Sequence, residues 1–238
     1  MARFHYYPGM EKKHEGLPTG EERPVSWDWG RVVGEDRAFW ETSPAGAVVE
    51  FAWHLRREGK RRVYDLGCGL GRHLVLLAEM GFDVAGSDLS PLAVAASSER
   101  LAALGLPGRV REGEMTAIDE PASSFDAVLS YNVLYHALPE GIARALDEVR
   151  RILRPGGLFL VTFLADTAPS FAQGERIGER TILKTEGPEE RVPHTYLDRE
   201  GVLILLREFS LERLSYVEQE YDRLARKGCH YVALARKG

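Results

Sequence analysis

Three glycines at alternate positions, Gly67, Gly69 and Gly71, follow a short apolar run at residues 63–66 and precede a helical pattern. Glycine has no Cβ, so it accepts the positive φ angles of a tight turn between a strand and a helix, and it lets the main chain approach a ligand closely. Backbone N–H groups at the start of such a helix then face that ligand. The pattern predicts an α/β fold with a nucleotide-like group bound at this turn.

The spacing of the glycines distinguishes between two sequence patterns that are found at nucleotide-binding sites. Counted from Gly67, the dinucleotide fingerprint G-x-G-x-x-G requires glycine at position 72, where this chain has Arg72. The observed pattern is D-x-G-x-G-x-G and begins at Asp65. A second acid, Asp88, ends an apolar alternation about 20 residues past the loop, where a βαβ nucleotide site places the partner of the ribose hydroxyls.

Asp88 has a structural interpretation as well, because a helix is predicted just after it. Ser90 and Pro91 supply the N-cap and the first-turn proline of that helix. The cap therefore needs no contribution from Asp88, and we expect this carboxylate to be available to a ligand.

In form and order these motifs resemble those of the class I S-adenosylmethionine (SAM) dependent methyltransferases, and in particular the small-molecule enzymes among them. The resemblance continues through residues 110–115, 125–136 and 153–161 and extends over about residues 61–237. It implies SAM as cofactor and S-adenosylhomocysteine as product. The residues to which it assigns cofactor binding are Asp65, Gly67, Cys68, Gly69, Gly71, Asp88, Leu89, Glu114, Met115 and Asn132.

Two residues of that set have simpler interpretations. Cys68 is also a small apolar residue of the kind that fills space within a glycine loop, and no C-x-x-C pair is present. At the position of Glu114 the family more often has Asp, and an exposed loop acid is the alternative there.

Strand-like and helix-like patterns alternate along the chain, which is typical of a parallel sheet covered by helices on both faces. We expect a Rossmann-like three-layer sandwich with a seven-stranded, mostly parallel sheet and an antiparallel C-terminal hairpin. The expected strands lie near 61–66, 82–88, 109–114, 125–131, 157–164, 209–220 and 230–235, and the helices near 44–57, 71–80, 91–104, 139–153 and 198–208.

Two regions fall outside this sheet. Residues 1–40 are expected to form an N-terminal flap or packing arm, and residues 41–238 the methyltransferase domain. Within that domain the connection at about 165–197 far exceeds the roughly 2–6 residues usual in α/β units, so we expect an insertion that covers the substrate.

Candidate catalytic residues come from the fourth predicted strand and from the insertion. His136 follows that strand and His194 lies in the insertion; either could act as a general base if the acceptor is protonated, and an ordinary loop histidine is the alternative. His73, in the first predicted helix, is expected to contact backbone or the cofactor. The predicted substrate contacts are the aromatic residues Tyr131, Tyr135, Tyr196 and Trp29. The seven histidines form no ligand cluster in sequence, so no metal site is expected.

Composition and absent motifs narrow the partners. The net charge of −5 disfavours binding to nucleic acid. No apolar stretch approaches the roughly 20 residues that span a bilayer. We therefore expect a cytoplasmic protein that binds neither nucleic acid nor a membrane. Residues 130–133 lack the N-P-P-Y-like turn of amino-group methyltransferases of adenine or glutamine, which favours a small-molecule acceptor. An NAD-dependent oxidoreductase and a non-catalytic SAM-binding protein are the alternatives.

Overall fold

Strands and helices alternate along the chain in the computed structural model, which describes Trp29 and residues 44–221 and 226–238. The predicted N-terminal arm therefore lies outside the described residues, except for Trp29. The elements, in chain order, are α2 (Gly46–Arg57), β1 (Arg62–Leu66), α3 (Arg72–Glu79), β2 (Asp83–Asp88), α4 (Pro91–Ala103), β3 (Arg109–Glu112), β4 (Phe125–Ser130), α5 (Pro139–Ile152), β5 (Leu153–Ala165), the 3-10 turn η1 (Pro169–Ala172), β6 (Glu175–Arg176), β7 (Thr181–Leu183), the 3-10 turn η2 (Gly187–Glu189), β8 (Pro193–Leu197), α6 (Arg199–Leu205), β9 (Ser210–Tyr221) and β10 (Arg226–Arg236).

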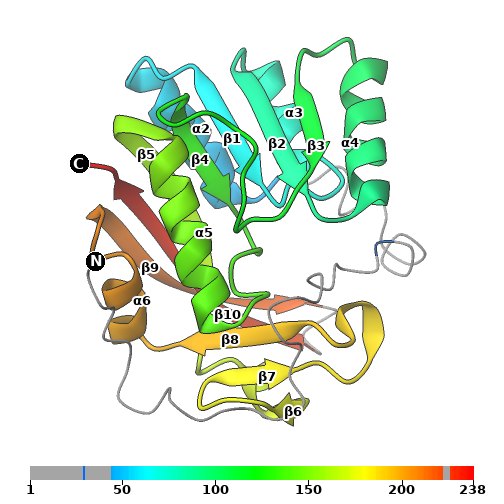
Figure 1. The fold of residues 1–238 in the computed structure, drawn as a ribbon, viewed down its shortest axis with the longest axis vertical. Coiled ribbons are helices and arrows are strands. Elements are labelled where there is room, and N and C mark those ends of the chain that lie inside the picture. Colours follow the sequence, from blue (N-terminus) through cyan, green and yellow to red (C-terminus); the bar gives the residue numbers. More distant parts are fainter. Residues whose placement is uncertain (1–28, 30–43, 222–225) are drawn as a thin grey trace.

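The body of the sheet has the strand order β3-β2-β1-β4-β5-β10-β9 (Figure 1). Strands β1 to β5 pair in parallel, and β10 runs antiparallel to both β5 and β9. The predicted Rossmann-like fold, with its C-terminal antiparallel hairpin, is confirmed. Three further short strands, β8, β7 and β6, extend the sheet from the end of β5, where Leu164 pairs with Tyr196.

Apolar side chains of the central strands point to both faces of the sheet, because successive residues of a strand alternate in direction. Tyr64 packs in one core together with α5 and α6, whereas its neighbour Val63 packs in the other core with α2 and α3. Val128 and Leu129 of β4 divide in the same way. Burial on both faces explains why most residues of β4 and of the second half of β5 are apolar.

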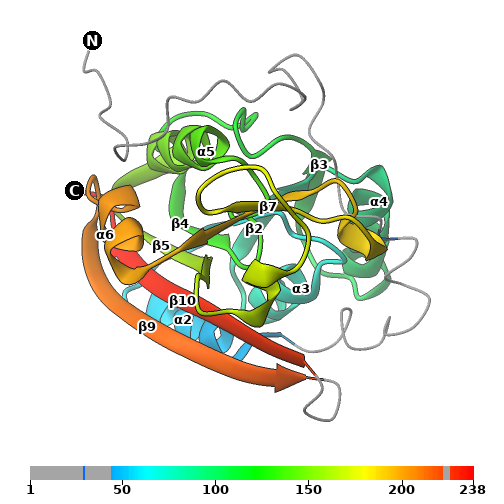
Figure 2. The ribbon, with the colours of Figure 1, turned by 90° about the horizontal axis from the view of Figure 1, so that it is seen from below.

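The connection between β5 and α6 is more ordered than the sequence indicated. It contains β6, β7 and β8, and Figures 1 and 2 place these strands on the side toward which β1, β2 and β4 point. Thr195 of β8 donates from its backbone N–H to Tyr135 O at 2.9 Å and from its hydroxyl to Ala137 O at 2.7 Å. These two bonds fix the inserted strands to the loop that follows β4. Strands β6 and β7, of two and three residues, are too short for a period-two pattern to be recognised in sequence.

A buried threonine anchors the same loop from the sheet. Asn132, which has a left-handed φ of 61°, donates its backbone N–H to Thr162 Oγ1 at 2.7 Å. The Thr162 hydroxyl in turn donates to Asn132 Oδ1 at 3.2 Å. Thr162 lies within β5 and has no exposed surface, so it connects the interior of the sheet to the turn at the end of β4.

Among the helices in the described part of the chain, none combines the length and the apolar content that a membrane span requires.

We expect Thr162→Val to destabilise the protein by about 1–3 kcal/mol, because the substitution keeps the shape of the side chain but leaves the polar groups of Asn132 without their buried partner. Equilibrium unfolding in urea measures this loss. Thr185→Val, at an exposed threonine just after β7, is the control and should change stability by no more than about 0.5 kcal/mol. Equal midpoints for the Thr162 variant and the wild type would contradict the anchoring role.

Candidate functional site

The glycine loop joins β1 to α3 with three left-handed residues. The φ angles of Gly67, Gly69 and Gly71 are 73°, 53° and 81°. A Cβ on Gly67 would lie 2.4 Å from Val133 Cγ2, and one on Gly69 would lie 2.8 Å from Cζ2 of Trp29. Both the conformation and the close packing therefore require glycine at these positions.

Asp88 holds this loop from the end of β2. Its Oδ2 accepts a hydrogen bond from Gly69 N at 2.9 Å, and its Oδ1 accepts one from Ser90 N at 2.9 Å. Ser90 Oγ accepts from Ala93 N and caps α4, as predicted. Burial raises the pKa of Asp88, and the backbone N–H donors oppose that rise. A carboxylate has about four acceptor positions, so the two bonds leave room for ligand hydroxyls.

Asp65, at the start of the motif, is a buried acid in β1. It is only 1% exposed, and its Oδ2 has no hydrogen-bond partner among the described residues. Burial raises the pKa of Asp65 to about 7, while the positive charge of Arg72 lowers it and the nearby Asp88 raises it further. Buried polar atoms in folded proteins almost always have a partner, so this oxygen marks a place where a ligand N–H group would fit.

The other predicted cofactor residues also lie at the ends of the parallel strands. Leu89, Glu114 and Met115 follow β2 and β3 and are partly exposed, and Asn132 follows β4. Gly113 N donates to Asp88 O at 3.0 Å and so joins the ends of β2 and β3. The structure thus brings the predicted set together at one edge of the sheet, and each ligand contact stays a prediction.

Cys68 differs from the rest of that set. It is 5% exposed, and burial raises the pKa of its thiol well above the usual value. A neutral buried thiol behaves as a small apolar side chain, in agreement with the space-filling interpretation. Cys68 and Cys229 are both free.

The two predicted catalytic histidines meet at a glutamate. Glu189 of η2 lies between them, with Oε1 3.6 Å from His136 Nε2 and Oε2 3.2 Å from His194 Nε2. The imidazole ring centroids of the two histidines are 4.6 Å apart. Their potential ligand atoms lie within 4.8 Å of one another, a spacing at which the three residues could hold a metal ion.

The sequence did not indicate Glu189 as a site residue, and so it did not indicate this cluster. The three residues come from the loop after β4, from η2 and from β8, so no local spacing reveals them. Glu189 also lies among other acids, at Glu186 and Glu190, and nothing in the sequence distinguishes it from a solvated charge. The expectation that the chain has no metal site rested on local spacing alone.

The pKa values of His136 and Glu189 bear on the prediction that a histidine acts as the general base. Burial, with the nearby His194, lowers the pKa of His136 to about 3. Burial would raise the pKa of Glu189, but the hydrogen bond and charge of His194 and the charges of His136 and Lys184 lower it to about 2. At neutral pH, His136 is therefore neutral and a weak proton acceptor, while Glu189 is ionised.

The aromatic residues predicted to contact the substrate do not all lie together in the structure. Tyr135 is buried beside the cluster, with its ring centroid 4.4 Å from that of His136. Trp29 lies against the glycine loop at Gly69. Tyr196 is fully buried, donates its hydroxyl to Ser170 Oγ at 3.0 Å and has a packing role.

Tyr131 packs on the ring of His73 in α3, with centroids 5.5 Å apart. His73 Nε2 accepts from Ala45 N at 3.3 Å, which confirms the predicted backbone contact of this histidine.

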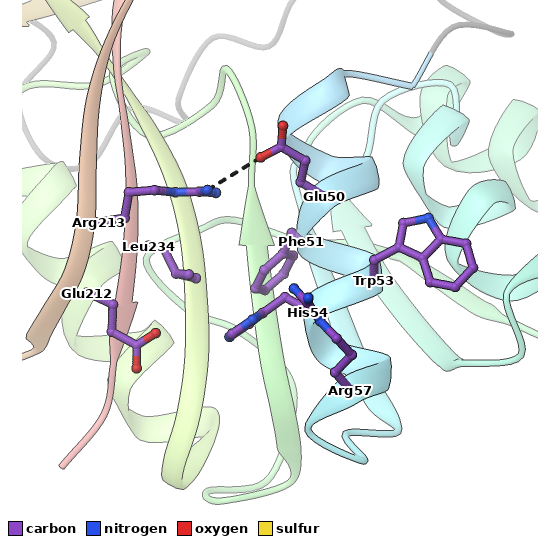
Figure 3. A pocket seen from close by; sticks show the side chains of 8 residues that line it. All are labelled: Glu50, Phe51, Trp53, His54, Arg57, Glu212, Arg213 and Leu234. Atoms are coloured by element: carbon purple, nitrogen blue, oxygen red, sulfur yellow. Dashed lines mark hydrogen bonds and ion pairs between the residues drawn. The ribbon is translucent and has the colours of Figure 1, made fainter.

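A surface pocket of about 560 Å³ lies away from these residues, between α2 and the β9–β10 hairpin (Figure 3). Glu50 of α2 points across it toward Arg213, and their side chains form an ion pair at 3.4 Å. No predicted site residue lines this pocket.

The chain is similar to known proteins in sequence and in fold. Residues 63–157 match the protein family described as a methyltransferase domain. Among curated relatives, a ubiquinone biosynthesis O-methyltransferase of Azorhizobium caulinodans is 30% identical over 111 residues, which are 47% of this chain and 43% of that protein. The chain thus spans about half the length of the curated relatives it matches.

Solved structures extend the likeness beyond the matched motifs. A SAM-dependent methyltransferase of Methanosarcina mazei aligns with a TM-score of 0.66 at 21% identity, covering 75% of this chain and 92% of that one. A 1,6-didemethyltoxoflavin-N1-methyltransferase of Burkholderia thailandensis, with bound 1,6-didemethyltoxoflavin and S-adenosylhomocysteine, aligns with a TM-score of 0.63 at 19% identity, covering 91% and 92%. At these identities the structures show a common fold. The chain thus has the fold of class I SAM-dependent methyltransferases, and its residues 63–157 are similar to a methyltransferase domain.

Proposed function

We propose that this protein transfers the methyl group of SAM to a small-molecule acceptor. The observation that carries the proposal is the acidic pair at the glycine loop. Asp88 is bonded to the loop at Gly69 N, and Asp65 presents a buried oxygen with no partner among the described residues. Both lie at the carboxyl ends of parallel strands, where open α/β sheets bind their ligands.

The residues at this edge fit the parts of SAM. Asp88 would accept hydrogen bonds from the ribose hydroxyls, and Asp65 from the ammonium of the methionine part. Glu114 and Met115, at the end of β3, would contact the adenine. When bound, SAM supplies a sulfonium methyl group that is already electrophilic, so the protein has to bind, orient and exclude water.

The acceptor side would be formed by the loop after β4 together with the inserted strands. Thr195 fixes β8 to that loop, so both parts lie at the same edge of the sheet. Two similar proteins are named for oxygen and nitrogen methylation, which supports an acceptor with a hydroxyl group or a ring nitrogen. Holding such an atom in line with the methyl group can lower the barrier by roughly 7–11 kcal/mol.

Transfer itself is tested with labelled methyl groups. Purified protein and SAM labelled in the methyl group are incubated with a panel of hydroxylated aromatics and nitrogen heterocycles, and the label is followed into products of low mass. We expect transfer to at least one of these classes. Tight SAM binding without transfer to any of them would favour the non-catalytic alternative.

Asp88→Ala should weaken binding of SAM and S-adenosylhomocysteine at least tenfold, because each charge-assisted hydrogen bond contributes about 1.5–3 kcal/mol. Isothermal titration calorimetry gives the dissociation constants, with NAD as a control ligand that should not bind. Asp83→Ala, an exposed acid at the start of the same strand, should bind like the wild type. Unchanged affinity in the Asp88 variant would refute the ribose assignment, and NAD binding would favour an oxidoreductase.

Asp65→Asn should make the ligand-free protein more stable at high pH while it weakens SAM binding. The pKa of Asp65 is raised from 3.8 to about 7, so the wild type loses stability as pH rises between these values, when only the unfolded state readily ionises. Asparagine does not titrate.

The stability advantage of the Asp65→Asn variant should therefore grow by up to about 1 kcal/mol per pH unit across that interval. Urea unfolding at pH 5, 6, 7 and 8 measures it, and Asp83→Asn serves as control. If the stability of the variant and that of the wild type depended on pH in the same way, Asp65 would not have the raised pKa described above.

A further inference from the structure

The cluster of His136, Glu189 and His194 is not needed to hold SAM, yet its side chains converge from three separate segments. His194 Nε2 lies 3.2 Å from one carboxylate oxygen of Glu189, and His136 Nε2 lies 3.6 Å from the other. Ligands of a tetrahedral zinc ion with bonds of about 2.1 Å lie about 3.4 Å apart. The observed distances lie on either side of that value.

The hydrogen bonding of His194 adds a second, independent observation. Its Nδ1 lies 3.1 Å from Val192 O, and because a carbonyl oxygen only accepts, Nδ1 carries the hydrogen. In a neutral imidazole, Nε2 then has a lone pair, and this lone pair faces the Glu189 carboxylate at 3.2 Å. Two electron-rich atoms repel at that distance unless a cation lies between them.

A proton on Nε2 and a metal ion both satisfy this requirement, and the rest of the cluster favours the metal. The neighbouring His136 places a second nitrogen 3.6 Å from the other oxygen of Glu189, so the carboxylate lies between two imidazoles. Metal-ligating histidines usually donate their second ring N–H to a carbonyl or carboxylate, as His194 does to Val192.

We propose that His136, Glu189 and His194 bind one divalent transition-metal ion. Two imidazole nitrogens with one carboxylate are typical ligands of Zn²⁺ and Fe²⁺, whereas Mg²⁺ and Ca²⁺ prefer oxygen ligands throughout. The set is also incomplete, because three protein ligands leave at least one coordination position to water or to another molecule.

The open position gives this site a role that rests on the proposed function. His136 belongs to the loop after β4, on the proposed acceptor side, so an acceptor hydroxyl could occupy the open position. Binding to the ion would lower the pKa of that hydroxyl and orient its oxygen.

The test uses the full chain with its affinity tag removed and with metal stripped by a chelator. Zn²⁺ alone is titrated calorimetrically, and Co²⁺ is added in a separate experiment to record its visible absorption. We expect one Zn²⁺ per chain with micromolar or tighter affinity, and a Co²⁺ spectrum that reports nitrogen and oxygen ligands.

Two adjacent glutamates provide matched variants. Glu189→Gln keeps the shape of the side chain but removes the charged ligand, and it should weaken Zn²⁺ binding by at least the roughly 10–100-fold that loss of a supporting hydrogen bond costs. Glu190→Gln changes an exposed neighbour and should bind Zn²⁺ like the wild type. Thermal unfolding with and without Zn²⁺ shows whether each variant is folded, and the ion should raise the melting temperature of wild type and Glu190→Gln only.

Two results would overturn the proposal: wild-type protein that binds no Zn²⁺ below about 100 μM, or equal Zn²⁺ binding by the folded Glu189 and Glu190 variants. The cluster would then be an ion pair between protonated His194 and Glu189. S-adenosylhomocysteine is titrated into the same samples. Binding of this ligand without Zn²⁺ binding rejects only the metal site, and the reverse result rejects only the cofactor assignment.

Discussion

The hydrogen bond from Gly69 N to the Asp88 carboxylate is the contact on which the candidate site depends. It joins the loop after β1 to the end of β2 at 2.9 Å, while Ser87 O accepts the N–H groups of Gly67 and Cys68 from the same loop. Together these bonds fix the left-handed turn and thereby the start of α3. Because Asp88 also accepts from Ser90 N, one carboxylate positions the beginnings of both helices that flank the glycine loop.

The predictable parts of this site are those indicated by residues close together in the sequence. The spacing of the three glycines, the acid that ends β2 and the cap at Ser90 are each read within a few residues, and all lie where the sequence placed them. The alternation of strand-like and helix-like patterns likewise located the seven strands of the main sheet, and burial on both faces leaves mostly apolar residues in β4 and in the second half of β5.

What the sequence did not reveal depends on contacts between distant segments. The strands β6, β7 and β8 are short, and β8 owes its position to Thr195 and to pairing with the end of β5. Glu189 is an ordinary acid in sequence and becomes distinctive only when His136 and His194 face it. Asp65 and Glu189 differ in the same way. Burial favours a raised pKa for both carboxyl groups, yet the pKa of Asp65 is raised and that of Glu189 is lowered, because His194, His136 and Lys184 act on Glu189.

The two hydrogen bonds of Thr195 have a consequence for how such proteins diversify. Surface segments between the elements of a sheet generally tolerate changes in length without disturbing that sheet. In this chain, however, the insertion is tied to Tyr135 O and Ala137 O, on the loop that also carries His136. An insertion transplanted from another protein would therefore have to supply an equivalent donor at this point. Without such a donor, the transplanted segment would no longer be bonded to the loop after β4, and the position of that loop would no longer be fixed.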